Sequence, residues 1–585
     1  MTASPFLEFL KNRIDITRVP FSDRGSRLLV FKDTAADQLY IKLAERLTAI
    51  QPGLDTYRFR PAYIQDFCFI DGEGMPLSCN LTTYPHVLLF QTRLGDFSLA
   101  FHNRDTLAIG LPAGKTAGIR FRVSTQMWQE REDGGTLMAV RNLAYRTNGQ
   151  VLKNDLGLER EAYVVELVAK GGDDVAIHLN VRSDLLLDGA PVPFSETLAA
   201  AERRWHDWFE RVPAVAERYR DHYYYAWWVM SNNLVEPLGK VTHEAMMPSK
   251  VQYVGIWNWD ACFHALAFRH VDPKLARDQL RTMLSCQLPD GMIPDAVYDE
   301  AVVADIEHPL RAEVTKPPIM AWAALKLNET DPNLDFLQEI YVPLVRWNAW
   351  WFSMNDDDAD GLVQYNHPYS SGLDDSPLWD YGLPVESPDL NTYLCVQMGS
   401  LALMAEALGM EAEGAMWRRR AAAIVRRMIE DFWDEEAGLF RALHDEQPIP
   451  VATPFNLYPL WSGQLPDDIR ERLITHLTDP DEFWGAILIP SVARNDPRHD
   501  PETMWRGPVW VNINYIFVEA LRQVGEHDLA QSLMEKTLAL IMSQPGIYEY
   551  YHPQTGDPPA TAADAFGWTA AVFIDLAIQA SVAEH

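Results

Sequence analysis

The sequence predicts a multidomain protein in which an N-terminal antiparallel β-sandwich, residues 1–195, precedes an all-α domain, residues 196–585. Two observations support this order. Apolar and polar side chains alternate over residues 25–185, which is the period of strands with one buried face. From residue 195 onward the apolar residues recur with the helical period instead. A chain of 585 residues is also too long for one small core.

The strand pattern is clearest in two segments of the N-terminal region. In "GIRFRVS", Ile119, Phe121 and Val123 alternate with two arginines. In "VAIHLNVR", residues 175–182, every second side chain is a large aliphatic one. Turn-forming stretches such as "DGEG" and "KGGDD" separate these segments. We therefore expect antiparallel strands that each bury one face in a sandwich.

The helical region shows start and stop signals as well as periodicity. In "DPKLARDQLRTMLSCQ", Asp272 is placed to cap a helix whose first residue is Pro273. Gly525 is placed to end one helix just before the next, which runs through "HDLAQSLMEKTLALI". Such paired helices form bundles, solenoids or closed toroids, and their periodicity does not distinguish among the three.

Composition limits the function. A formal net charge of -32 makes a nucleic-acid partner improbable, because phosphate groups would repel the chain. We expect no membrane span, because no apolar run reaches about 18 residues, and the chain start lacks the pattern of a signal peptide. We expect a cytoplasmic protein whose five scattered cysteines are reduced, buried thiols. They are Cys68, Cys79, Cys262, Cys286 and Cys395.

Five connections between the predicted helices each combine an acid or a base with aromatic residues. They are residues 251–263, 314–322, 367–380, 504–515 and 546–558. Two carboxylates that face a sugar suffice for glycosidic cleavage, since one protonates the leaving oxygen and the other activates water or attacks. Aromatic walls raise the pKa of the acid by desolvation. The 19 tryptophans also suit sugar rings, although large cores use tryptophan too.

The motifs "SGLD", "WRGPVW" and "YEYY" occur in this order over residues 250–575. Together they resemble the inverting (α/α)6-toroid glycosidases of family 63, nearest to the mannosylglycerate and glucosylglycerate hydrolases and more distantly the family 37 trehalases. The resemblance implies that the all-α domain is an (α/α)6 barrel with its active site at one end. It implies an exo-acting inverting α-glycosidase, here an α-glucosidase, for a small α-linked disaccharide or glycosyl conjugate.

The resemblance also assigns roles to individual residues. It makes Asp374 of "SGLD" the general acid and Glu549 of "YEYY" the general base. Asp375 is then a turn or supporting residue. The implied sugar-binding residues are Tyr253, Trp257, Trp259, Asp260, Trp505 and Trp510.

Two residues depart from the pattern of the family. Ser370 stands where the relatives often have Glu, and Lys316 stands where they usually have Gln. Lysine only donates hydrogen bonds and carries a charge. Lys316 therefore either pairs with an acid such as Asp260 or Glu313, or binds the substrate, and we expect the substrate contact. The insert with which the glycerate-specific relatives hold the glycerate carboxylate has no counterpart here.

Several simpler interpretations stay open for these residues. Glu502 is a competing base, and Asp260 could cap the helix that follows it. A sugar epimerase on a similar toroid is an alternative, and it would use histidines such as His264, His367 or His552. A non-catalytic glycan-binding protein is the other alternative, since it would keep the tryptophans without an acid and a base.

One acidic stretch resembles the start of a calcium loop. "NDDDADGL" offers Asp356, Asp358 and Asp360, but the twelfth position of the loop is His367 rather than Glu. We expect a solvated turn there, with structural calcium as the alternative. We expect no catalytic metal or other cofactor, since no His and Cys cluster is present. The expected partner is a small carbohydrate, and the oligomeric state is left open.

Overall fold

The computed structural model describes residues 5–46, 62–125, 127–138, 141–159, 162–170, 172–182 and 191–582. The chain forms two compact units. Unit 1 comprises Met1–Val212, Arg220–Glu236 and Lys250–Val254, and unit 2 comprises Pro213–Tyr219, Pro237–Ser249 and Gly255–His585. Unit 1 thus extends past residue 195 through α3 (Phe194–Phe209) and α4 (Arg220–Asn232). The domain boundary between residues 195 and 196 stays a prediction.

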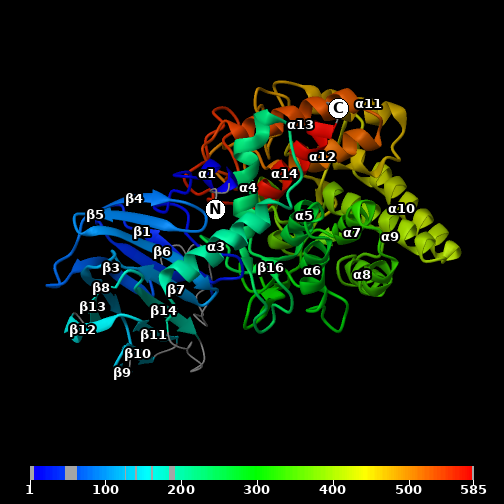
Figure 1. Ribbon diagram of the computed structural model, residues 1–585. Helices are drawn as coiled ribbons and strands as arrows, with labels where there is room; N and C mark the ends of the chain where they lie inside the picture. Colours follow the sequence, from blue (N-terminus) through cyan, green and yellow to red (C-terminus); the bar gives the residue numbers. More distant parts are fainter. Residues whose placement is uncertain are drawn as a thin grey trace. The chain divides into compact units, whose positions relative to one another are not determined.

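Two antiparallel sheets build most of unit 1 (Figure 1). In spatial order, the six-stranded sheet contains β1 (Leu28–Lys32), β2 (Leu39–Leu43), β3 (Ile64–Asp71), β8 (Thr116–Val123), β13 (Ala162–Lys170) and β12 (Gln150–Glu159). The eight-stranded sheet contains β4 (Cys79–Thr83), β5 (Leu88–Thr92), β6 (Gly95–Asn103), β7 (Thr106–Gly110), β14 (Ala176–Arg182), β11 (Asn142–Thr147), β10 (Gly134–Met138) and β9 (Met127–Arg131).

Aromatic side chains join the two sheets. Phe69 of β3 lies with its ring centroid 4.8 Å from that of Phe90 and 4.5 Å from that of Phe97 in the other sheet. Phe121 of β8 meets Tyr145 of β11 edge to face at 5.9 Å. These five rings are buried, and β8 alternates buried and half-buried residues from Ile119 to Val123 as its sequence predicts. The predicted β-sandwich is confirmed.

The expectation of one buried face per strand is wrong for β14. All of its residues except the last are buried, including His178 and Asn180. The reason is α3, which packs on β6 and β7 and covers the second face of the sheet beside β14. The buried Asn180 side chain donates from Nδ2 to Thr106 Oγ1 at 2.7 Å.

Unit 2 is helical (Figure 1), and the contacts between its helices close it into a ring. Its inner elements contact one another in the order α5 (Asn258–Phe268), α7 (Met320–Thr330), α9 (Pro388–Ala407), η4 (Pro454–Ser462), α12 (Val511–Gln523) and α14 (Gly567–Val582). Contacts between α14 and α5 close the ring. The outer elements of unit 2 are α6 (Pro273–Leu284), α8 (Leu334–Met354), α10 (Glu411–Asp431), α11 (Asp467–Thr478) and α13 (His527–Met542). A closed toroid is therefore the correct choice among the three helical architectures.

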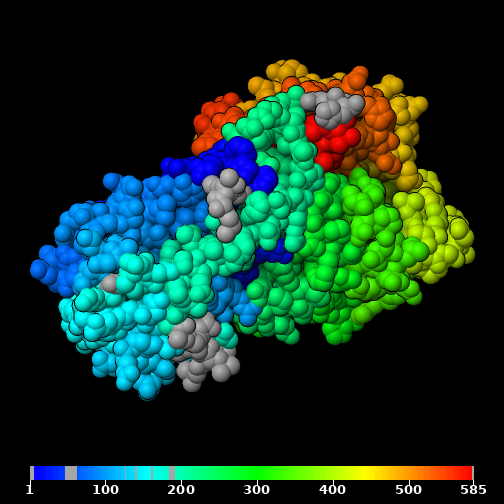
Figure 2. All heavy atoms as spheres, viewed as in Figure 1, coloured from blue at the N-terminus to red at the C-terminus, as the bar shows by residue number. Residues whose placement is uncertain are grey.

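Inner and outer helices differ as their positions require. Every residue of α5 is buried, whereas α10 buries one face and lies at the surface of unit 2 (Figure 2). The predicted start of α6 is confirmed. Asp272 caps the helix by accepting a hydrogen bond from the Leu275 backbone N–H, and Pro273 is the first helical residue.

Because inner and outer elements alternate along the chain, the inner ones begin at the same end of the ring. The predicted site segments precede α5, α7, α9, α12 and α14.

Two composition-based expectations can be compared with the structure. Among the described residues, no helix combines the length and the apolar character that a membrane crossing requires. All five cysteines are free thiols. The expectation that all are buried is wrong for two of them, since Cys79 opens the edge strand β4 and Cys286 follows the end of α6, where both are partly exposed.

Candidate active site

A glycine places the loop that carries Asp374. The short helix η2 (Pro368–Ser371) ends at Gly372, whose φ of 72° lies in the left-handed region. A Cβ at Gly372 would lie 2.4 Å from the indole ring of Trp259. Only glycine suits both the backbone angle and the close approach. The "SGLD" motif therefore seats the Asp374 loop against the first turn of α5.

Asp374 combines partial exposure with a shielded oxygen. About a quarter of its side chain is exposed (26%), while Oδ1 is covered and accepts no hydrogen bond within the described part of the chain. Burial raises the pKa of Asp374 to about 6, and the Lys316 ammonium, 3.9 Å from Oδ1, opposes the rise. The carboxyl group can therefore keep a proton under mildly acidic conditions.

Lys316 is buried in an ion pair, the alternative to a substrate contact, but with an acid that the sequence did not indicate. Its Nζ lies 2.8 Å from Asp295 Oδ1 and donates to the Tyr369 carbonyl at 2.6 Å. Its side chain is only 6% exposed. The paired acid is thus Asp295, and not Asp260 or Glu313 as suggested above. A direct contact between Lys316 and the substrate stays a prediction.

Asp295 and Asp260 complete a group that we call the buried charge cluster, made of Asp260, Asp295, Lys316 and Asp374. Burial raises the pKa of Asp260 to about 8, against the lowering effect of Lys316. Burial also raises the pKa of Asp295, again opposed by Lys316. The only sequence signal for Asp295 was an acid after a proline inside the apolar stretch "GMIPDAV".

Four tryptophans form a second group, the tryptophan cluster. Trp505 stacks on Trp510 with 3.7 Å between ring centroids and 2° between planes. Trp259 lies 6.2 Å from Trp505 and 5.4 Å from Trp568, and Trp510 lies 5.5 Å from Trp568. The structure thus brings three predicted residues together. Trp568 was missed, although it stands at the second position of α14.

The loop that carries Glu549 rests on the same cluster. The Glu549 backbone N–H donates to the Ala563 carbonyl at 3.0 Å, and its Oε2 accepts from the Ala563 N–H at 3.0 Å. Trp568 Nε1 donates to the Glu549 carbonyl at 3.4 Å. On the Asp374 loop, Asp375 Oδ1 accepts from the Trp505 backbone N–H at 2.8 Å. Both predicted carboxylates therefore lie on loops anchored to the tryptophan cluster, and Asp375 has a supporting contact.

The remaining sugar-binding candidates lie in other surroundings. Trp257 is buried and meets Tyr298 at 5.7 Å, so it faces a different neighbour from Trp259. Tyr253 is buried in unit 1, and its position relative to the other candidates stays a prediction. The competing base Glu502 is 68% exposed and lies 3.7 Å from His552.

The histidines and the acidic turn have local roles. His264 is fully buried on α5, and burial lowers its pKa to about 3. His367 Nδ1 accepts from the Tyr369 N–H at 3.1 Å, and so caps η2. The carboxylates of Asp356, Asp358 and Asp360 come within 4.8 Å of one another, and Asp360 pairs with Arg427 at 3.0 Å. The solvated turn stays the prediction here, with calcium as the alternative.

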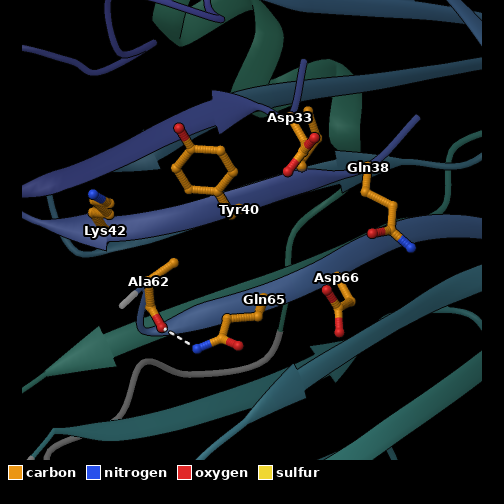
Figure 3. Close-up of a pocket in the computed structure, with 8 residues that line it drawn as sticks. Asp33, Gln38, Tyr40, Lys42, Ala62, Gln65 and Asp66 are labelled. Atoms are coloured by element: carbon orange, nitrogen blue, oxygen red, sulfur yellow. Dashed lines mark hydrogen bonds between the residues drawn. The ribbon is translucent and has the colours of Figure 1, made fainter. Parts of the chain in front are cut away.

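Unit 1 contains an open polar hollow of about 400 Å³ on the six-stranded sheet (Figure 3). Tyr40 and Lys42 of β2 line one side, and Gln65 and Asp66 of β3 line the other. Gln65 Nε2 donates to the Ala62 carbonyl at 2.9 Å. None of the predicted site residues lines this hollow.

The all-α ring, with acids and stacked tryptophans on the loops at one end, is typical of a toroidal glycoside hydrolase. The mannosylglycerate hydrolase MGH1-like glycoside hydrolase domain matches residues 253–569, and this chain belongs to that family. Mannosylglycerate hydrolase from Thermus thermophilus is 29% identical over 56% of this chain and 95% of its own length. Glucosylglycerate hydrolase from Mycolicibacterium hassiacum is 25% identical over 55% of this chain and 92% of its own length.

Solved structures agree with this assignment. The Thermus thermophilus family 63 mannosylglycerate hydrolase, in complex with Tris and D-glycerate, is 25% identical and has a TM-score of 0.53, with 60% of this chain and 98% of that chain covered. A bacterial glucoamylase complexed with acarbose has a TM-score of 0.59 over 97% of both chains at 11% identity, which shows the fold alone. Family membership favours a hydrolase over the epimerase and the glycan-binding alternatives.

Proposed function

We propose that this chain is an inverting, exo-acting α-glucosidase that hydrolyses a small α-linked disaccharide or glycosyl conjugate. The observation that carries the proposal is the anchoring of the two carboxylate loops on one tryptophan cluster, through Trp505 and Trp568. Asp374 is partly exposed and has a pKa raised to about 6, which suits a proton donor. The stacked Trp505 and Trp510 are each 1% exposed, so the cluster gives the two loops a rigid support.

In this proposal the two carboxylates act on opposite faces of the sugar. Asp374 gives its proton to the glycosidic oxygen as the bond from that oxygen to the anomeric carbon breaks. Glu549 takes a proton from a water molecule whose oxygen forms the new bond to the same carbon. The product sugar then has the opposite anomeric configuration, and the site needs a carboxyl separation of about 6.5–9.5 Å to hold the water.

The names of the mannosylglycerate and glucosylglycerate hydrolases among the relatives support a small substrate. The probable mannosyl-oligosaccharide glucosidase from Schizosaccharomyces pombe supports a glucosidase activity instead. The Thermus thermophilus enzyme has also been solved in complex with glucose. Because the glycerate-binding insert has no counterpart in this sequence, we do not restrict the proposed aglycone to glycerate.

A hydrolysis screen tests the proposal directly. Purified enzyme is incubated with α-linked glucose disaccharides, glucosylglycerate and mannosylglycerate, with β-linked disaccharides as controls. We expect hydrolysis of at least one α-glucoside, and proton NMR should show the β-anomer of glucose as the first product. Early appearance of the α-anomer would overturn the inverting mechanism, and activity on β-linked substrates alone would overturn the α-specificity.

A further inference from the structure

The buried charge cluster contains an acid that the proposed reaction does not use. We propose that Asp295 is a positioning residue, which takes up the charge of Lys316 so that Asp374 can hold the proton it donates. This inference rests on the proposed function, since it assigns a purpose to the surroundings of the proposed acid. It concerns Lys316, a residue at which this chain departs from its family.

The distances show which acid holds the ammonium. Lys316 Nζ lies 2.8 Å from Asp295 Oδ1 but 3.9 Å from Asp374 Oδ1. The first distance is that of a close ion pair, whereas Asp374 lies farther from the ammonium. Lys316 Nζ also donates a hydrogen bond to the Tyr369 carbonyl at 2.6 Å. The ion-pair partner of Lys316 is therefore Asp295, while Asp374 is the more distant acid.

Neighbouring hydrogen bonds fix both partners. The Asp295 backbone N–H donates to the Val303 carbonyl at 2.9 Å, and its carbonyl accepts from the Asn258 N–H at 3.0 Å. Beside Lys316, Thr315 Oγ1 donates to the Ile293 carbonyl at 2.5 Å. The Thr315 N–H donates to Ser370 Oγ at 3.3 Å. Ser370, the other departure from the family, thus helps to hold this segment.

Lys316 and three acids surround Asp374. Lys316 offsets the charge of Asp295 at 2.8 Å, and the pKa of Asp260, raised by burial to about 8, keeps that acid protonated at neutral pH. Burial raises the pKa of the neighbouring Asp375, while the Trp505 N–H and the nearby Arg506 act to lower it.

His367 is another titratable group near Lys316. Burial lowers its pKa, so it is neutral at neutral pH and adds no charge.

Removal of Asp295 would leave an uncompensated ammonium in the cluster. Lys316 is only 6% exposed, so water could not replace the lost carboxylate. The nearest remaining acceptor of opposite charge is Asp374 at 3.9 Å. An opposite charge this close lowers the pKa of an aspartate by about 1–3 units, so Asp374 would lose its proton at lower pH.

The test compares the pH dependence of kcat/KM on an α-glucoside for four proteins: wild type, Asp295→Asn, Lys316→Gln and the double variant. The decline of kcat/KM at high pH reports deprotonation of the acid. We expect this decline to move by about 1–3 pH units to lower pH in Asp295→Asn, and to higher pH in Lys316→Gln. The double variant, which removes both charges, should return close to wild type.

A matched control separates this effect from general destabilisation. Lys326 of α7 pairs with Glu519 at 2.6 Å, and Lys326→Gln should leave the pH profile unchanged. An unshifted profile in a folded Asp295→Asn variant would overturn the inference, even if its melting temperature fell. If Asp295→Asn does not fold, Lys316→Gln and the double variant still test the inference. It would be overturned if the pH profiles of both variants matched that of wild type.

An α-glucosyl fluoride distinguishes failure of this inference from failure of the proposed function. Fluoride leaves without protonation, so the decline at high pH should vanish for this substrate in wild type. A decline that persists would mean that Asp374 is not the proton donor, which would sink the proposed function and this inference together. A decline that vanishes, combined with an unshifted Asp295→Asn profile on the ordinary glucoside, would reject the inference alone.

Discussion

At the scale of single residues, Asp374 and Glu549 carry the proposed chemistry. Asp374→Asn and Glu549→Gln keep the shape of each side chain and remove the titrating group. We expect each change to lower kcat by about 10²–10⁴-fold, the range of general acid and base contributions. Steady-state kinetics on the best α-glucoside measures the loss, and circular dichroism checks the fold.

Glu502→Gln is the matched control for this pair. Glu502 is a carboxylate of the neighbouring "PETMWRG" segment but is 68% exposed. Its variant should keep near wild-type kcat. If Glu502→Gln lost activity while Glu549→Gln kept more than about a tenth of it, the base would be Glu502.

The pKa of Asp374 predicts the pH range of the enzyme. Burial raises it to about 6, and an acid catalyst works only while it is protonated. We therefore expect kcat/KM to fall as the pH rises through about 6. As the pH falls below 6, activity should be retained until the base is protonated. A profile of kcat/KM against pH checks this, and a flat profile up to pH 9 would contradict it.

Residues with a motif could be predicted from the sequence, whereas their partners could not. The structure brings Asp260, Lys316 and Asp374 into one cluster and three predicted tryptophans into another. Asp295 was missed because its role depends on a contact with a residue 21 positions away along the chain. Such long-range contacts leave no periodic signal in the sequence.

At the scale of elements, the turn at Gly372 joins the Asp374 loop to α5. Gly372→Ala would force a Cβ to within 2.4 Å of the Trp259 ring at a φ of 72°. We expect a loss of about 1–3 kcal/mol in unfolding free energy and a lower kcat, because the displaced loop carries the acid. Urea denaturation and steady-state kinetics measure the two effects.

Gly114→Ala separates the two causes of that loss. Gly114 has a similar φ of 67°, but nothing lies within 4 Å of the Cβ position. It should show the cost of the backbone angle alone, about 1 kcal/mol, with kcat unchanged. Equal stability losses in the two variants, with kcat intact in both, would show that the Trp259 contact does not position the loop.

A buried carboxylate ties three inner helices together. Asp575 of α14 lies 2.8 Å from Arg269 and 2.7 Å from His270, both just after α5, and accepts from the Tyr515 hydroxyl of α12 at 2.7 Å. Asp575→Asn should cost about 3–5 kcal/mol of unfolding free energy, because it leaves a buried arginine without its counter-charge. The exposed Asp445→Asn, at 85% exposure, is the control.

The same carboxylate predicts how this stability depends on pH. Burial acts to raise the pKa of Asp575, but Arg269 and His270 outweigh it and hold the pKa well below its usual value. A carboxylate with a depressed pKa stabilises the fold above its unfolded pKa, about 3.9, and loses that effect as pH falls through the lower folded value. The difference in melting temperature between wild type and Asp575→Asn should therefore be largest near neutrality and shrink below about pH 4.

At the scale of the whole molecule, the order of a sandwich followed by a toroid could be predicted from periodicity and from the family motifs. The closure of the ring could not be predicted from periodicity, because contact between α14 and α5 joins helices about 300 residues apart. The division into two compact units does not follow the change of pattern at residue 195. Unit 1 takes α3, α4 and residues 250–254, since compactness depends on contacts across the chain rather than on a change of pattern.

This division predicts how the chain responds to a cut at the predicted domain boundary. In the full chain, α3 packs on β6 and β7, and it buries Trp205, Trp208 and Phe209. Arg204 of α3 pairs with Asp23 at 2.5 Å and donates to the Phe101 carbonyl at 2.8 Å. A fragment of residues 196–585 would keep most of α3 and lose these partners.

We expect the 196–585 fragment to aggregate or to melt well below the full chain, because three large aromatic side chains would lose their cover. Size-exclusion chromatography and thermal unfolding measure both outcomes. Co-expression with residues 1–195 is the control and should restore a folded, soluble complex, since it returns the strands on which α3 packs. A monomeric 196–585 fragment that melts like the full chain would instead show that residue 195 ends an independent domain, and that α3 needs no support from the sheets.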